Sequence, residues 1–211
     1  MEFIKKKYET SCFTGSEINE HLPVLYELAL NCNTIFETGC NGIRTTYALT
    51  YGLINNKNKG KKKILLNDEL PCNIIELLYV SADNSINFSI KYKWGNNLKL
   101  KIKERFDLVV IDTWHVYGQL KRELELFSKI CDKYIVIFFT DTDRIYGESV
   151  RKKCNFEEQS LISGIPVEEI KKGTQFAIDE FIKKNNEEWK VFIEYKNNNG
   201  LTILEKIPSK N

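Results

Sequence analysis

The chain has 211 residues and a mass of 24.7 kDa, which suits one domain with a full hydrophobic core. Hydrophobic residues make up 42% of it, charged residues 28%, and the net charge is only +2. This balance excludes the strongly basic surface typical of nucleic-acid-binding proteins, and no apolar run is long enough to span a membrane. We therefore expect one cytoplasmic domain, residues 1–211, with neither a nucleic-acid nor a membrane partner.

The six cysteines are scattered, with no C-x-x-C pair and no cysteine–histidine cluster. They are Cys12, Cys32, Cys40, Cys72, Cys131 and Cys154. The spacing predicts reduced, partly buried thiols in an intracellular protein and argues against a structural zinc site.

The N-terminal third begins with residues 1–15, which show little periodicity and are expected to form a polar lead-in. Apolar residues at helical spacing then predict a helix over 16–31, with Ser16 as its cap. Pro23 either bends this helix or marks its true first turn. His21, near the start of the helix, is interpreted as a structural residue.

Residues 33–51, NTIFETGCNGIRTTYALTY, are the stretch around which the chain is organised. A short apolar strand (35–36) precedes a turn with two glycines and a helix over about 45–53. A strand, a glycine turn and a helix N-terminus form a site for a nucleotide-like ligand, because glycine lets the backbone approach closely. The spacing is E-x-G-x-x-G, and a carboxylate at Glu37 suits a cationic amino or sulfonium group. The pattern indicates a pocket for S-adenosylmethionine (SAM).

A second acidic position follows the predicted strand at residues 64–66, which ends in Asn67-Asp68-Glu69. In Rossmann-like folds an acidic residue at the end of the second strand binds ribose hydroxyls. Asp68 and Glu69 both qualify, and Asp68 lies nearer the strand end. The alternative is an N-cap for the helix predicted from Pro71 onward.

The third strand is predicted over 85–91 from its alternation of polar and apolar residues. The loop after it, 94–98, could lie against an adenine ring, with Trp94 as a stacking face and Asn96 as a hydrogen-bonding group. An ordinary turn is the alternative for this loop.

The sequence FDLVVIDTWH at 106–115 predicts a strand buried on both faces, and hence a central parallel strand. Asp112 follows the end of this strand, and His115 lies three residues later. Ligands in open α/β sheets bind at the carboxyl ends of strands, so these two residues form a candidate acid/base or metal pair. The alternative is that Asp112 caps the next helix while His115 packs.

The remaining elements complete an alternating order. A helix around 120–127 leads to a buried strand at 135–139, whose end is Thr140-Asp141-Thr142-Asp143. Helical segments with a break near Gly173 precede two final strands, 189–195 and 201–206, and the Asn-Gly between them is a hairpin signal. This order predicts a doubly wound, Rossmann-like α/β fold. Its sheet would be seven-stranded and mostly parallel, with a C-terminal antiparallel hairpin and helices on both faces.

Four stretches carry a resemblance to a known group: ETGCNGIRTTYA, LLNDELPC, IDTWHVYGQLKREL, and SGIPVEEI with NNNGLTIL. Together they resemble small class I SAM-dependent methyltransferases of large DNA viruses and bacteria, related to sugar O-methyltransferases. The resemblance covers about residues 15–206, and IDTWHVYGQLKREL is its most specific part. It implies SAM as cofactor, S-adenosylhomocysteine (SAH) as product, and a sugar or glycan hydroxyl as acceptor. A viral member would act in the host cytoplasm.

The resemblance implies that Glu37, Gly39 and Asp68 bind SAM. We extend the expected cofactor site to neighbouring positions: Thr38, Cys40, Asn41, Thr45, Glu69, Trp94, Asn96 and Asp112. The run DTWH is also similar to metal-dependent catechol-type enzymes, which implies Asp112 as a metal-binding or orienting carboxylate and His115 as a general base, neutral near pH 7. Candidate acceptor contacts are Trp114, Tyr117, Arg144, Tyr146 and Glu148.

The sequence departs from this group after the fifth strand, where Phe138-Phe139-Thr140 replaces the usual His-Asp-Thr. Phenylalanine neither ligates a metal nor transfers a proton, so Mg²⁺ would need Asp112 with Asp141 or Asp143. We therefore expect a metal-independent enzyme that relies on His115. The alternative is a catalytically impaired SAM-binding or partner-binding module. A nicotinamide enzyme is disfavoured by the E-x-G-x-x-G spacing, and the residues identify neither the exact acceptor nor the oligomeric state.

Overall fold

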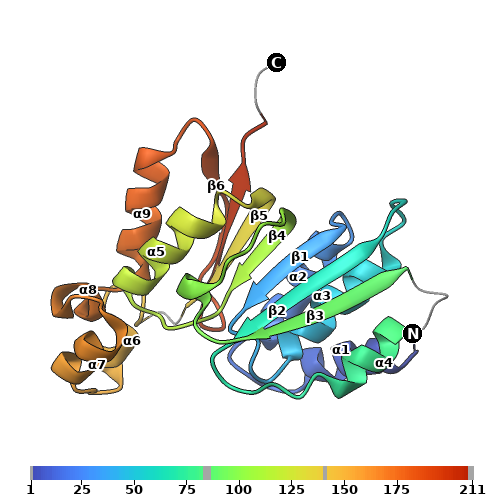
Figure 1. Ribbon diagram of the computed structural model, residues 1–211, viewed down its shortest axis with the longest axis horizontal. Coiled ribbons are helices and arrows are strands. Elements are labelled where there is room, and N and C mark those ends of the chain that lie inside the picture. The colour runs from blue at the N-terminus through green and yellow to red at the C-terminus, as the bar shows by residue number, and fades with distance from the viewer. Residues whose placement is uncertain (1, 83–86, 140–141, 209–211) are drawn as a thin grey trace.

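The computed structural model describes residues 2–82, 87–139 and 142–208, and these residues form a seven-stranded sheet in the order β3-β2-β1-β4-β5-β7-β6 (Figure 1). The strands are β1 (Thr34–Thr38), β2 (Lys62–Asp68), β3 (Phe88–Trp94), β4 (Phe106–Ile111), β5 (Cys131–Phe138), β6 (Trp189–Tyr195) and β7 (Leu201–Lys206). Strands β1 to β5 pair in parallel, and β7 is antiparallel to both β5 and β6. The predicted Rossmann-like α/β fold with its C-terminal antiparallel hairpin is confirmed.

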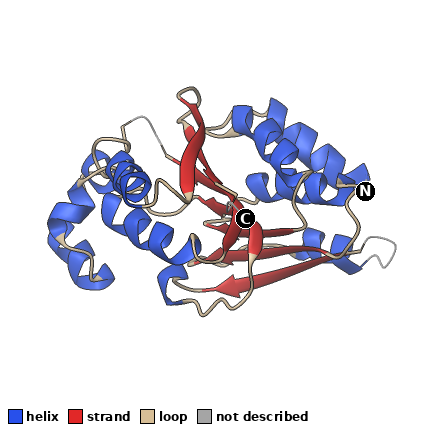
Figure 2. Cartoon of the chain, turned by 90° about the horizontal axis from the view of Figure 1, so that it is seen from above, coloured by secondary structure: helices blue, strands red, loops and turns tan. Residues whose placement is uncertain are grey.

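Helices cover both faces of this sheet, as the view from above shows (Figure 2). They are α1 (Glu2–Phe13), α2 (Leu22–Ala29), α3 (Arg44–Asn55), α4 (Ile75–Ala82), α5 (Tyr117–Phe127), α6 (Glu148–Arg151), α7 (Phe156–Ser163), α8 (Val167–Lys171) and α9 (Thr174–Lys184), with short 3₁₀ helices η1 (Asn19–His21) and η2 (Asn97–Lys99). No helix among the described residues is long and apolar enough to cross a membrane.

Alternate residues of each central strand enter opposite hydrophobic layers. In β1, Ile35 packs with α1 to α4, whereas Phe36 packs with α5 and α9. In β4, Val110 packs in the same layer as Ile35, and Val109 packs in the same layer as Phe36. Side chains of a strand point to opposite faces with a period of two, so a run of consecutive apolar residues fills both layers.

The first fifteen residues differ from the expected polar lead-in, because α1 occupies most of them. Ile4 of this helix is fully buried, and the ring of Tyr8 stacks on that of Tyr26 with centroids 5.3 Å apart. A few apolar side chains at i, i+4 spacing are therefore enough to dock a helix whose other face remains polar and solvated.

The helix expected over 16–31 is shorter than predicted, because α2 begins at Leu22 after the 3₁₀ turn η1. Pro23 lies in the first turn, which settles the two alternatives in favour of a helix start. His21 is buried, and its Nε2 lies 2.9 and 3.0 Å from the carbonyl oxygens of Asn197 and Asn198. This histidine is structural and ties the β6–β7 turn to the start of α2.

Further boundaries differ from the sequence prediction, and β5, for example, begins at Cys131 instead of residue 135. Helix α4 begins at Ile75 instead of Pro71, and β3 runs from Phe88 to Trp94 instead of 85–91. Residues 85 and 86 of that predicted strand lie outside the described residues.

The order of strands fixes where a ligand can bind. Strand β1 lies between β2 and β4, so the chain leaves β1 in one direction across the sheet and later returns to its other side. Ligands of open α/β sheets bind at the carboxyl ends of strands at such a reversal point. The ends of β1, β2 and β4 therefore define the candidate site.

Candidate functional site

A cavity of about 680 Å³ opens where these three strands end. One wall comes from the turns that follow the strands, and the other comes from α5, α6 and α7. The lining residues are Thr38, Gly39, Asn41, Asn67, Asp68, Glu69, Leu70, Asn96, Asn97, Asp112, Thr113, Trp114, Gln119, Glu148, Lys152, Gln159, Ile162 and Ser163.

The turn after β1 is packed tightly between its neighbouring strands. The Gly39 N–H donates to the carbonyl of Asn67 at 2.9 Å, and the Asp112 N–H donates to the carbonyl of Thr38 at 3.0 Å. Gly39 has φ +83°, and a Cβ at this position would overlap the backbone carbonyl of Asp112. Glycine is required here because the backbone of β1 approaches that of β4 so closely.

Glu37 occupies a different place from the one expected. Its carboxylate is buried outside the cavity lining, where it accepts hydrogen bonds from the hydroxyls of Thr45 and Thr46 in the first turn of α3. Burial raises the pKa of Glu37 to about 7, although the two threonine hydroxyls oppose the rise. Glu37 and Thr45, both predicted cofactor contacts, instead join β1 to α3.

Asp68 lies on the cavity wall with a fixed orientation. Its Oδ2 accepts from the N–H of Asn41 at 2.9 Å, and its Oδ1 accepts from the N–H of Leu70 at 2.8 Å. Asn96 donates to Glu69 Oε1 at 2.6 Å beside it. Both residues also line the cavity. The structure thus brings together Asp68, Glu69, Asn41 and Asn96 as the sequence predicts.

Trp94 does not take the predicted stacking position. The side chain is 70% exposed and lies outside the cavity lining, and its indole Nε1–H donates to the carbonyl of Glu69 at 2.7 Å. The tryptophan therefore holds the end of β3 against the loop after β2.

A buried polar network below the cavity was missed by sequence reasoning. Glu123 of α5 is fully buried, and its Oε1 accepts from Asn97 at 2.5 Å, Thr113 at 2.6 Å and Gln119 at 2.8 Å. Asn97 also donates to the hydroxyl of Thr38 at 3.0 Å, and burial raises the pKa of Glu123. The network fixes the ends of β1 and β4 to α5. Gln119 and Glu123 at i, i+4 on the buried side of an amphipathic helix were the signal in the sequence.

The imidazole of His115 lies between two carboxylates. Its Nε2 is 3.2 Å from Asp112 Oδ1, and its Nδ1 is 3.3 Å from Asp143 Oδ2. Asp143 is fully buried and also accepts from the Arg151 guanidinium at 2.9 and 3.0 Å. Burial lowers the pKa of His115, but the hydrogen bonds to Asp112 and Asp143 outweigh it and raise the pKa to about 10. The expected neutral imidazole is therefore an imidazolium at pH 7.

Two of the five candidate acceptor residues line the cavity. Trp114 donates from its Nε1–H to Ser149 Oγ at 3.1 Å, and Glu148 Oε2 accepts from the N–H of His115 at 3.1 Å. Lys152 and Gln159, which sequence reasoning did not single out, line the same wall.

The other three candidate acceptor residues contact the protein elsewhere. The Tyr117 hydroxyl donates to Glu180 of α9, and Arg144 binds Gln175 at 2.7 Å and Glu194 of β6. Tyr146 is exposed and forms an isolated β-bridge with Lys172. These contacts join α5 and the segment after β5 to α9 and β6, an arrangement that local sequence does not reveal.

The predicted metal ligands near Asp112 are only partly described. Asp141 lies outside the described residues, and Phe138 and Phe139 are buried in the hydrophobic layers. Among the residues that are described, Asp143 is bound to His115 and Arg151, both cationic. A divalent cation at Asp112 would meet these positive charges, so this part of the structure does not fit a Mg²⁺ site.

Solved structures with a similar fold match most of the chain. The N-methyltransferase NodS from Bradyrhizobium japonicum has a TM-score of 0.58, with 14% identity over 92% of this chain and 97% of that one. The fold is that of the Rossmann-like methyltransferases. SAH-bound methyltransferase PaMTH1 from Podospora anserina gives 0.54, with 15% identity over 97% and 88%. The O-methyltransferase TomG from Streptomyces achromogenes, in complex with SAM, gives 0.56, with 11% identity over 99% and 91%. No protein family and no curated protein sequence matches the chain.

Proposed function

We propose that this methyltransferase-like chain uses SAM to methylate a hydroxyl group of a sugar or glycan. One observation carries the proposal: the glycine turn after β1, Asp68 at the end of β2 and Asp112 after β4 line a single cavity. Two structures that share the fold contain SAM or SAH. The cavity volume of about 680 Å³ lies in the range of small-molecule sites.

The residues at the strand ends fit the cofactor. Each carboxylate oxygen of Asp68 accepts a hydrogen bond from a different backbone N–H. These bonds fix the carboxylate and leave lone pairs for two ribose hydroxyls. Asn41, Glu69 and Asn96 lie beside it on the same wall. Bound SAM supplies an electrophilic methyl group on a positively charged sulfur.

The carboxylates that line the cavity, and not the buried Glu37, are the groups that we propose attract the cationic part of SAM. Among the described residues that line the cavity, four carry carboxylates and one carries an ammonium group. They are Asp68, Glu69, Asp112, Glu148 and, as the cation, Lys152. This excess of negative charge favours a ligand with sulfonium and amino groups over a dinucleotide with a pyrophosphate.

Asp112 is the group that we propose takes the proton from the acceptor hydroxyl. Its side chain lines the cavity, whereas His115 is protonated and lies behind it. As the new O–C bond forms and the S–C bond breaks, the hydroxyl proton passes to the Asp112 carboxylate. His115 orients that carboxylate and is itself oriented by Asp143, so it acts as a positioning residue.

The acceptor wall suits a polyhydroxylated molecule. Trp114 offers an aromatic face, and Glu148, Lys152 and Gln159 offer hydrogen-bonding groups around the same space. The glycan class also follows from the resemblance of the sequence to sugar O-methyltransferases.

Calorimetric titration with SAH tests the cofactor site. We expect Asp68→Asn to weaken binding by about 10- to 100-fold, the effect of losing hydrogen bonds to a charged group. Asp179→Asn, at an exposed carboxylate on α9, is the matched control and should bind like wild type. Absence of binding to the wild-type protein would overturn the proposal.

A methyl-transfer screen against sugars, with SAH release as the signal, tests the chemistry. His115→Gln should keep SAH affinity but lower kcat about 100-fold, because Asp112 loses the partner that orients it and a misplacement of about 1 Å has an effect of this size. With Asp112 as base, kcat of the wild type stays flat from about pH 6 to pH 9; with His115 as base it rises throughout this range. Tight SAH binding with no transfer to any acceptor would instead support the binding-module alternative, which the buried Phe138 and Phe139 favour.

A further inference from the structure

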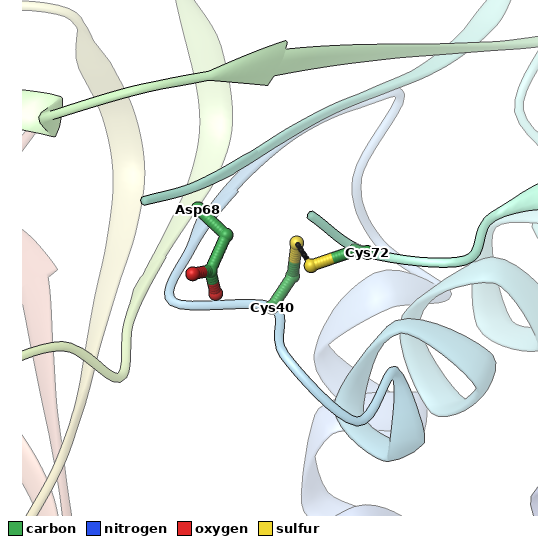
Figure 3. Close-up of side chains that lie close together, drawn as sticks. All are labelled: Cys40, Asp68 and Cys72. Carbon is green, nitrogen blue, oxygen red and sulfur yellow. Dashed lines mark hydrogen bonds between the residues drawn. The ribbon is translucent and has the colours of Figure 1, made fainter. Parts of the chain in front are cut away.

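Two cysteines that are far apart in the sequence face each other beside Asp68 (Figure 3). Cys40 lies in the turn after β1, and Cys72 lies in the loop between β2 and α4. The thiol of Cys40 donates to Cys72 Sγ, and the two sulfur atoms are 3.7 Å apart. One carboxylate oxygen of Asp68 lies within 4.8 Å of both sulfurs. Within the described residues this is the only such group of three metal-ligating side chains.

The spacing of the two sulfur atoms matches that of a zinc site. Two thiolates bound to tetrahedral Zn²⁺ with Zn–S bonds of about 2.3 Å stand about 3.8 Å apart. A disulfide requires about 2.05 Å, so the sulfurs would have to approach by more than 1.5 Å to form that bond. The observed 3.7 Å suits a shared cation without movement of either loop.

The surroundings of the pair also favour a cation. The ionisable groups near the Cys40 thiol include Cys72, Asp68 and Glu37, each of which is anionic when ionised. Cys40 is buried, Cys72 is half-buried, and Asp68 lines the cavity. Two of the three ligands are therefore partly accessible, Asp68 from the cavity and Cys72 from its loop.

We propose that Cys40, Cys72 and Asp68 form a site for Zn²⁺ or a similar thiophilic divalent cation. Two sulfurs and one carboxylate oxygen provide three of the four positions of a tetrahedral site and leave one for water or a ligand. Each thiol loses its proton to solvent on binding, so affinity rises with pH. This site is separate from the Asp112–His115 pair on the opposite side of the glycine turn.

The site would regulate the cofactor pocket, an inference that rests on the proposed function. Asp68 is the carboxylate proposed to bind the ribose hydroxyls, and a metal ion on its oxygen competes with them. Zinc and SAH would then weaken each other's binding, and zinc-loaded protein would bind SAH about tenfold more weakly, a coupling of the usual size between sites.

Cobalt is the probe for the metal site. We would titrate Co²⁺ into reduced, chelator-treated protein and record the thiolate-to-cobalt charge-transfer band and the intense visible bands of tetrahedral Co²⁺. Both bands are expected in the wild type and should disappear when Zn²⁺ is added. Cys72→Ser should lose the charge-transfer band, whereas Cys154→Ser, at a half-buried cysteine after α6, should keep it.

The result on wild-type protein decides the proposal even if Cys72→Ser does not fold. Excess Co²⁺ without a charge-transfer band would overturn the site, and so would an unchanged band in folded Cys72→Ser. Loss of two thiols to a mild oxidant in protein that shows no cobalt band would assign the pair to a disulfide instead. Because the cobalt spectrum involves no SAH, its outcome is independent of the cofactor titration. Cobalt binding without any effect on SAH affinity would overturn only the competition.

Discussion

The carboxyl group of Glu37 lies beneath the glycine turn, and its burial gives the protein a testable pH dependence. The folded-state pKa is raised from 4.5 to about 7. Between these values the folded protein keeps a proton that the unfolded chain has lost, so the free energy of unfolding falls as the pH rises from about 5 to 7. We expect Glu37 to account for about 2 kcal/mol of that fall.

Glu37→Gln removes this titration while keeping an oxygen and a similar shape. Urea unfolding at both ends of the range should therefore show a smaller loss of stability in the variant than in the wild type. The quantity to compare is the change of the free energy of unfolding with pH in the variant and in the wild type. Other buried groups such as Glu123 contribute equally to both and cancel in the difference. Equal slopes would show that Glu37 ionises normally in the folded state.

At the same scale, strand-end positions were predicted well and side-chain directions less well. Asp68 and Asp112 line the cavity because residues at the carboxyl end of a parallel strand, or just after it, lie at that edge of the sheet. Glu37 lies one residue before the end of β1 and shares the face of Ile35, so it points toward α3. The period of two could have shown this. No local pattern, however, could bring Asp143 to His115, because they belong to loops after different strands.

At the scale of elements, the contact between α2 and α3 depends on a glycine. A Cβ on Gly52 would lie 2.5 Å from the carbonyl oxygen of Tyr26 and 2.6 Å from the Cβ of Ala29. Gly52→Ala should destabilise the protein by about 1–3 kcal/mol through overpacking, although alanine favours a helix by about 1 kcal/mol. Thermal unfolding measures the effect.

The matched control for this substitution is Gly15→Ala, since a Cβ at Gly15 would meet no heavy atom within 4 Å. We expect the unfolding temperature of the control to stay close to that of the wild type. A Gly52→Ala protein as stable as the control would mean that α2 and α3 can move apart without a loss of stability.

The elements that the sequence predicted best are those with strong periodicity. The final strands agree with the structure to the residue, because alternating side chains and the Asn-Gly turn mark both of their ends. Helix α1 was missed, since only Ile4 among its apolar residues is buried and the helix depends on aromatic contacts with α2 and α3. Its stability comes from distant parts of the chain, which local periodicity does not report.

At the scale of the whole molecule, stability is unevenly divided. All of α7 is described and none of its residues is buried, and Leu161 and Ile162 on it are 87% and 78% exposed. The central strands β1 and β4 are instead buried on both faces. Hydrogen exchange should therefore be fast for the amides of α7 and slow for those of β4, because local opening exposes little surface at α7.

Mass-spectrometric exchange on peptides covering 156–163 and 106–111 measures this contrast. Protection of α7 comparable to that of β4 would contradict the prediction and would indicate that another chain covers Leu161 and Ile162 in solution. Dilution of the protein during the exchange period distinguishes protection by a second copy from protection within one chain. Protection by a second copy weakens when the protein is diluted.

The place of β7 has a consequence for synthesis on the ribosome. This strand follows all the others in the chain, yet it lies inside the sheet between β5 and β6. Until residue 206 has emerged, the nascent chain carries an unpaired edge along β5, with Phe138 and Ile137 uncovered beside it. Such an edge can pair with strands of other chains. Chaperone demand during translation should therefore be greatest just before the last strand appears.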